Sequence, residues 1–192
     1  NSADEASRFV DVWLDDMLLI DDFAFRTATP FIDAPAGVEF RISILPPNST
    51  SPENPIWFRN YTLEGGEKYQ LIANGIVSPS GYNPATPFDI YVNPVAREMA
   101  GSMSNTDVVV FHGSTDAPTV DVIARNVATL VDDAAYGDIT GYINVPPAAY
   151  TLDLTLADGT TLVNSFVADL SGLGGGSAVV FTRLIFPGQS IR

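Results

Sequence analysis

The sequence predicts an all-β protein made of two tandem β-sandwich domains, and three observations lead to this fold class. Apolar residues make up 46% of the 192 residues, which is enough for a packed core. The 14 prolines and 15 glycines are spread along the chain at the spacing of short strands and turns, and no segment has a helical period of useful length. Finally, the pattern of residues 10–44 recurs at residues 120–154, which indicates two domains of one type.

The internal repeat begins with a short valine-rich motif. Val10-Asp11-Val12 recurs as Val120-Asp121-Val122, and each motif is followed by a run that contains two adjacent acids. These acids are Asp21-Asp22 in the first copy and Asp132-Asp133 in the second. Chance similarity would not keep these features, a later proline and an alternating run in the same order and spacing. In both copies we expect the aspartate between the valines to make a structural hydrogen bond, for example to a loop amide.

Strands and turns within each copy follow from local patterns. Residues 38–44 and 150–156 alternate apolar and polar side chains, which places one face of each strand against the core and the other in water. Asp158-Gly159 then predicts a hairpin, because these residues tolerate the positive φ angles of a type I′ turn. Residues 46–55 are polar and proline-rich, and they predict a loop that lengthens the first domain. Residues 172–176 predict a flexible turn.

The repeat also predicts the domain boundaries and two missing strands. We expect one domain at residues 1–103 and another at 104–192. The second opens with the apolar run 108–111, whereas the matching strand of the first would precede residue 1. The first closes with residues 88–92, whereas the second ends soon after the strand expected at 178–186. Because a sandwich without a strand exposes backbone and core, either the chain is a fragment or neighbouring molecules supply the strands.

The charge of the chain excludes several classes of partner. Acidic residues number 23 against nine basic ones, which gives a net charge of −14. Such a surface repels phosphate backbones and anionic lipids, and no apolar run approaches the ~20 residues of a membrane helix, so we expect neither nucleic-acid binding nor membrane insertion. The excess acid fits either solubility in an extracellular setting or binding of a cation such as calcium. The absence of cysteine excludes disulfides and thiol chemistry.

Several segments together resemble a known family. Residues 112–122, with the sequence HGSTDAPTVDV, resemble the signature of domain-of-unknown-function family 4397, and so do residues 1–5 followed by 10–12. Residues 136–142 and 145–152 resemble the middle of the family pattern, while both ends of the chain depart from it. The resemblance implies immunoglobulin-like β-sandwich domains in an exported bacterial protein, often in tandem copies. It carries over no catalytic residue.

Candidate catalytic and metal-binding residues are sparse. His112 is the only histidine, and no nucleophile elbow accompanies it, so we favour a structural role and expect no catalytic or cofactor-binding residue. The acidic pairs Asp15-Asp16, Asp21-Asp22 and Asp132-Asp133 lack the spacing of a calcium loop. Within each pair, one acid is expected to face outward and the other to end a strand or cap a turn. The metal-binding residues therefore stay unknown, with calcium as an open alternative.

Aromatic residues offer a second kind of binding site. They could form a platform on which a sugar stacks, or they could pack in the core. Because Trp57 and Phe58 are adjacent, one of the two is expected to face out. The five candidates are Trp13, Trp57, Phe58, Tyr61 and Tyr82.

These observations favour a non-catalytic structural or adhesive protein, extracellular or at the cell surface. Its partners would be other copies of itself, other surface proteins or glycans, and strand exchange between copies would complete the sandwiches in a filament. The alternative is a carbohydrate- or calcium-binding module of a larger secreted protein. A hydrolase that uses carboxylates or His112 is the least favoured reading, because no catalytic constellation supports it.

Overall fold

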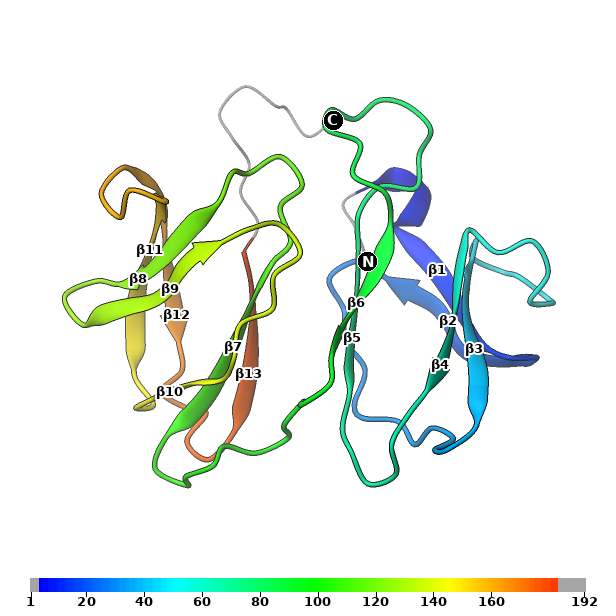
Figure 1. Cartoon of the computed structure of the whole chain (residues 1–192), viewed down its shortest axis with the longest axis horizontal. Helices are drawn as coiled ribbons and strands as arrows, with labels where there is room; N and C mark the ends of the chain where they lie inside the picture. Colours follow the sequence, from blue (N-terminus) through cyan, green and yellow to red (C-terminus); the bar gives the residue numbers. More distant parts are fainter. Residues whose placement is uncertain (1–3, 183–192) are drawn as a thin grey trace. The chain divides into compact units, whose positions relative to one another are not determined.

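A computed structural model describes residues 4–182, and within that range all regular structure is β-strand except one short 3-10 turn, η1 (Glu5–Ser7) (Figure 1). The all-β prediction is therefore confirmed, and no helix in these residues is long and apolar enough to cross a membrane. The chain divides into two compact units, Asn1–Ala96 and Arg97–Arg192. The boundary expected from the repeat, between residues 103 and 104, lies a few residues later in the chain.

The first unit is built from one four-stranded and one two-stranded antiparallel sheet. The strand orders are β2-β1-β3-β4 and β5-β6. The strands are β1 (Phe9–Leu14), β2 (Met17–Ala24), β3 (Glu39–Leu45), β4 (Trp57–Thr62), β5 (Gln70–Asn74) and β6 (Asp89–Asn93).

The core of the first unit lies between these two sheets. Alternate residues of β3 point into it, as the sequence predicts for Phe40, Ile42 and Ile44. Phe88 and Ile90 reach the same cluster from β6 and the residue before it. The period-two pattern thus places the apolar face of β3 against the second sheet, and it leaves the opposite face for polar side chains.

The second unit also has two sheets. Their strand orders are β12-β11-β8-β9 and β10-β7-β13, and every pairing is antiparallel except that of β7 with β13. The core between the sheets includes Val110 of β7, Val122 of β8 and Leu154 of β11. The strands are β7 (Thr106–His112), β8 (Val120–Ala124), β9 (Ala128–Ala134), β10 (Ile143–Val145), β11 (Ala149–Leu156), β12 (Leu162–Asp169) and β13 (Ser177–Thr182).

The last strand of this unit and the hairpin before it were both predicted from the sequence. The strand expected at 178–186 is present as β13 up to Thr182, and residues 183–186 lie outside the described residues. The hairpin between β11 and β12 is present, but only Gly159 of the Asp-Gly pair has a positive φ, so the turn is not type I′. The carboxylate of Asp158 instead accepts hydrogen bonds from the backbone N–H groups of Thr160 and Thr161, which favours a longer turn.

A buried aspartate facing a β-bulge occurs in both four-stranded sheets. Asp11 lies opposite the pair Asp21-Asp22, since Val10 pairs with Phe23 and Val12 with Ile20. The Asp22 residue has a positive φ of 48°, and its N–H donates to Asp11 Oδ1 over 2.9 Å. The extra residue of the bulge is therefore held by the buried carboxylate.

The second sheet has the same arrangement. Asp121 lies opposite Asp132-Asp133, and the N–H of Asp133, at a φ of 56°, donates to Asp121 Oδ1 over 2.7 Å. The predicted structural hydrogen bonds of Asp11 and Asp121 are thus confirmed. The expectation that one acid of a pair ends a strand or caps a turn is wrong for these two pairs, because the bulge accommodates both acids inside β2 and β9. Asp15-Asp16, in contrast, forms the turn between β1 and β2.

Asp11 accepts two further hydrogen bonds, from Ser49. Substitution of Asp11 should therefore lower stability more than substitution of Asp121. We expect Asp11→Asn to lower the free energy of unfolding of the first unit by about 2–3 kcal/mol, because an amide cannot accept from all three donors. Asp121→Asn should lower that of the second unit by about 1 kcal/mol. Urea unfolding measures the first effect by fluorescence, since both tryptophans, Trp13 and Trp57, lie in the first unit. Hydrogen–deuterium exchange measures the second. Equal losses of unfolding free energy in the two variants would contradict a stabilising role for the hydrogen bonds from Ser49.

Candidate functional site

A long loop between β3 and β4 folds over the outer face of the first unit's larger sheet. Ser49 anchors this loop: its N–H and Oγ donate to Asp11 Oδ2 over 2.7 and 2.6 Å, and its Oγ accepts from Trp13 Nε1 over 2.8 Å. Trp13 is only 6% exposed as a result. The predicted loop at residues 46–55 is therefore fixed to the sheet at its centre, and its second half forms one wall of a cleft.

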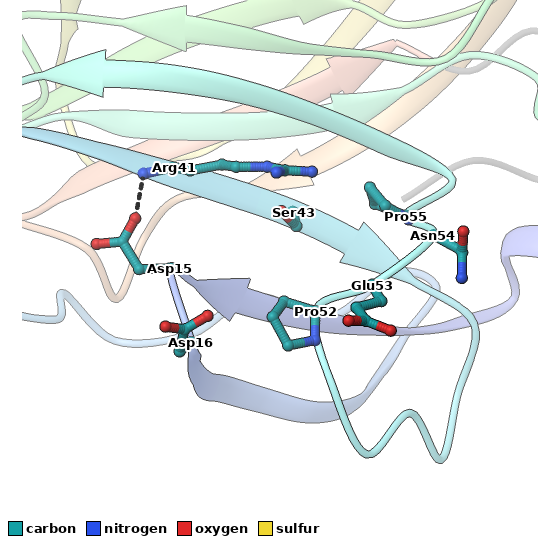
Figure 2. Close-up of a pocket in the computed structure, with 8 residues that line it drawn as sticks. All are labelled: Asp15, Asp16, Arg41, Ser43, Pro52, Glu53, Asn54 and Pro55. Atoms are coloured by element: carbon teal, nitrogen blue, oxygen red, sulfur yellow. Dashed lines mark hydrogen bonds between the residues drawn. The ribbon is translucent and has the colours of Figure 1, made fainter.

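The cleft has a volume of about 820 Å³ and opens on the face of β3 that points away from the core. Its lining comes from the turn after β1, from β3 and from the loop, as Figure 2 shows. The lining residues are Asp15, Asp16, Arg41, Ser43, Pro52, Glu53, Asn54 and Pro55.

The turn and the strand that line the cleft are bonded to each other. The N–H of Arg41 donates to Asp15 Oδ1 over 2.8 Å (Figure 2), and the N–H of Asp15 donates to the Arg41 carbonyl over 2.8 Å. The Arg41 guanidinium lies 4.0 Å from the centre of the Phe58 ring, on the neighbouring strand. Stacking on an aromatic face holds a guanidinium in place without using its hydrogen-bond donors. Stacking thus positions Arg41 at the cleft and leaves the N–H donors of its guanidinium for other partners.

Two polar atoms of the cleft are buried and have no hydrogen-bond partner in the protein. They are the Oγ of Ser43, a residue that is 1% exposed, and the Nε of Arg41. Buried polar groups in native proteins are nearly always hydrogen-bonded, and an unmatched one destabilises the fold. The alternation of β3 predicts Ser43 on the solvated face, but the loop covers that face. Other buried atoms in residues 4–182 also lack a partner, but these two belong to residues that line the cleft, and they mark it as a candidate binding site.

The acids of the first unit form one group with the geometry of a possible metal site. Asp11, Asp21 and Asp22 each place a carboxylate oxygen within 4.8 Å of the others. The Asp11 oxygens, however, accept from Asp22 and Ser49. Burial raises the pKa of Asp11, but these hydrogen bonds outweigh it and leave the pKa below its usual value. The hydrogen bonds at the bulge account for the proximity of these three carboxylates. Calcium binding stays a prediction.

His112 lies in the second unit and is fully buried. Its Nε2 is 3.1 Å from the carbonyl oxygen of Pro118, and its ring meets the Tyr136 ring edge-on at 6.5 Å. The nearby Ser114 Oγ donates to Asp116 over 3.0 Å. A buried imidazole held against a backbone carbonyl suits the structural role favoured from the sequence.

The five aromatic candidates do not form a platform of tryptophans. Trp13 is buried beneath the loop, and Trp57 is half-buried, with its ring edge-on to Phe88 at 6.1 Å. Tyr61 packs near Phe40. Phe58 is 57% exposed, so the expectation that one of two adjacent aromatics faces out is correct, and that residue is Phe58. Tyr82 is exposed as well.

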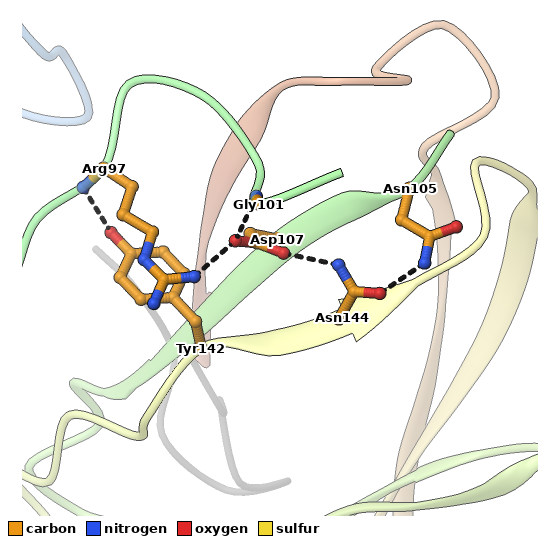
Figure 3. A network of polar contacts seen from close by, with 6 residues as sticks. All are labelled: Arg97, Gly101, Asn105, Asp107, Tyr142 and Asn144. Carbon is orange, nitrogen blue, oxygen red and sulfur yellow. Dashed lines mark hydrogen bonds and ion pairs between the residues drawn. The ribbon is translucent and has the colours of Figure 1, made fainter. Parts of the chain in front are cut away.

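A buried polar network fastens the start of β7 in the second unit (Figure 3). Asp107 is almost fully buried and accepts from Asn144 Nδ2 and Arg97 Nη1, each over 2.6 Å, and from the Gly101 N–H over 3.0 Å. The Arg97 guanidinium lies 4.6 Å from the Tyr142 ring centre. The hydrogen bond from Asn144 and the ion pair with Arg97 hold the pKa of Asp107 below its usual value, against the effect of burial. This network ties residues 97–101 to β7 and β10.

One comparison with known proteins bears on the second unit. Residues 106–179, from the start of β7 into β13, match the family described as "Domain of unknown function (DUF4397)". The family resemblance noted in the sequence is thereby supported for this segment. A search of curated proteins found no match to the chain.

Sequence reasoning did not single out Arg41 and Ser43. The signal that points to them is the combination of two polar residues on the outer face of β3 with a proline-rich loop present in one copy only. Periodicity assigns both side chains to water, because it carries no information about what a loop covers.

The lowered pKa of Asp107 predicts a pH-dependent contribution to stability. We expect Asp107→Asn to cost about 2–3 kcal/mol at pH 7, because it leaves the Arg97 and Gly101 donors poorly matched. The wild-type advantage is full above the unfolded-state pKa of about 3.9 and disappears as the pH falls through the lower folded-state value. Calorimetry, with hydrogen–deuterium exchange of β7, measures the difference between the two proteins at each pH.

Asp153 provides the matched control for this experiment. It pairs with Arg125 over 2.6 Å at the surface, and its hydrogen bonds from Arg125 and Ser165 lower its pKa to about 2. Because the Arg125 side chain is half-exposed and solvent screens its charge, Asp153→Asn should lower stability at pH 7 by less than Asp107→Asn does. A loss in Asp153→Asn as large as that in Asp107→Asn would show that burial of the network is unimportant.

Proposed function

We propose that the protein is a non-catalytic structural or adhesive component of an extracellular surface, made of two tandem immunoglobulin-like β-sandwich domains that associate with other copies by strand addition. The corresponding strand orders, β2-β1-β3-β4 and β9-β8-β11-β12, support two domains of one type. The match of residues 106–179 to a family of domains supports a modular architecture.

The observation that carries strand addition is the open edge of β13. The N–H of Asp107 on β7 donates to the Gly176 carbonyl, and Ala178 and Val180 continue the same parallel ladder. Successive residues of a strand direct their backbone groups to opposite edges, so the N–H and C=O groups of Val179 and Phe181 point away from β7. Within residues 4–182 no strand pairs with that edge along β13, and an isolated bridge joins Met99 to Gly176 just before the strand begins.

The first unit shows how the corresponding strand is paired. β5 follows β4 as β13 follows β12, and β5 is paired along its length with the antiparallel strand β6. A strand from a neighbouring copy would complete β13 in the same way. Phe181 is 56% exposed beside the edge and provides apolar surface for the incoming strand.

The contacts of the residues considered for catalysis support a non-catalytic role. His112 is buried against a backbone carbonyl, and the aspartates opposite the two bulges accept hydrogen bonds from backbone N–H groups. The net charge of −14 fits a protein of an extracellular surface.

Proline substitution at the β13 edge tests strand addition. Val179→Pro removes an N–H that points to the open edge, so we expect oligomers to dissociate while the folded unit persists. Light scattering with electron microscopy measures the mass distribution, and circular dichroism checks the fold. Val179→Lys should have the same effect, because a charge at an edge opposes pairing.

Val180→Pro is the matched control in the same strand. Its N–H faces β7, so this substitution should destabilise the unit itself. A wild-type protein that stays monomeric at all concentrations, or a Val179→Pro variant that assembles like the wild type, would reject strand addition.

A further inference from the structure

The cleft of the first unit requires a ligand that both donates and accepts hydrogen bonds. At its floor, Arg41 Nε is a donor without an acceptor, and Ser43 Oγ is unpartnered. Around them, Asp15, Asp16 and Glu53 present carboxylates, which accept only. A complementary ligand therefore needs acceptors for the floor and donors for the rim.

Three ligand classes fail this requirement. A metal ion needs converging oxygen ligands, but the acids of the cleft do not gather: the one such group in residues 4–182 is Asp11, Asp21 and Asp22. An organic cation such as an alkylammonium only donates and leaves Arg41 Nε unmatched. An anion would meet three carboxylates against one guanidinium.

A peptide fits the face of the sheet poorly as well. Peptides that bind as an added strand need an open strand edge, and those that bind as helices or polyproline segments need apolar or aromatic grooves. β3 is paired with β1 on one side and β4 on the other, so the strand beneath the cleft has no open edge. The lining is also polar apart from two prolines, which argues against an apolar ligand.

We propose that this cleft binds a neutral oligosaccharide, with Arg41 and Ser43 at its floor. Each sugar hydroxyl donates one hydrogen bond and accepts two, so adjacent hydroxyls accept from Arg41 Nε and the Ser43 hydroxyl while donating to the carboxylates and to Asn54. A volume of about 820 Å³ suits more than one sugar ring. This inference is independent of strand addition, because β13 contributes nothing to the cleft.

The second unit lacks the features that make the cleft. Trp13 pairs with Ser43 across β1 and β3, and the corresponding pair in β8 and β11 is Ile123 with Asp153. The Asp153 carboxylate is occupied by Arg125 and Ser165, and a short turn joins β11 to β12 in place of the long loop. The site is therefore assigned to the first unit alone.

Titration of the full chain with defined probes tests the proposal. Cellotetraose, maltotetraose, laminaritetraose and xylotetraose are each added in the millimolar range, and amide NMR spectra identify the responding residues. We expect at least one probe to shift residues of β3 and of the loop 46–55. Arg41→Gln and Ser43→Ala should each weaken that probe about tenfold, the effect of about one hydrogen bond.

Arg125→Gln, a change at the corresponding sheet of the second unit, is the matched control and should leave sugar binding unchanged. Ser43→Ala removes a buried hydroxyl without a partner, so its melting temperature should not fall, which separates lost binding from lost folding. Equal binding by all variants, no shift with any of the four sugars, or cleft shifts produced only by calcium chloride or spermine would each overturn the proposal.

Discussion

The carboxylate of Asp11 is the interaction on which most of the first unit's distinctive structure depends. One oxygen holds the Asp22 N–H and with it the bulge of β2, while the other holds Ser49 and with it the long loop. Ser49 in turn accepts from Trp13, so the loop covers a tryptophan that would otherwise lie on an exposed sheet face. Because the anchored loop forms a wall of the cleft, a backbone-supporting aspartate also determines where a ligand has room to bind.

The second unit shows what the same aspartate does without that loop. Asp121 supports its bulge through the Asp133 N–H, but the sheet face beyond it carries an open ion pair of Asp153 with Arg125. Two sheets with corresponding strand order therefore differ in the polar face that each presents. In the first unit, a loop covers Arg41 Nε and Ser43 Oγ, which have no partner; in the second, Arg125 and Asp153 pair with each other. The first arrangement costs stability unless something fills it, whereas the second does not.

Much of the fold follows from the sequence, because period-two patterning directly reports which strand face is buried. It predicts the inward residues of β3 and, through the recurrence of Val-Asp-Val, the structural hydrogen bonds of Asp11 and Asp121. It does not predict the bulges, since the paired acids read as strand ends until the register is known. The sequence pattern does not predict the cleft either. Ser43 is buried because a loop distant in the sequence covers it, and local patterning carries no information about such a contact.

The charge of the chain separates the two proposed modes of binding physically. Copies that each carry −14 repel one another, so strand addition at β13 must overcome a long-range Coulomb cost that dissolved salt screens. A neutral sugar meets no such cost, and its hydrogen bonds to Arg41 and Ser43 act over short distances that salt leaves almost unchanged. The two proposals therefore predict that self-association strengthens with ionic strength while glycan binding stays constant.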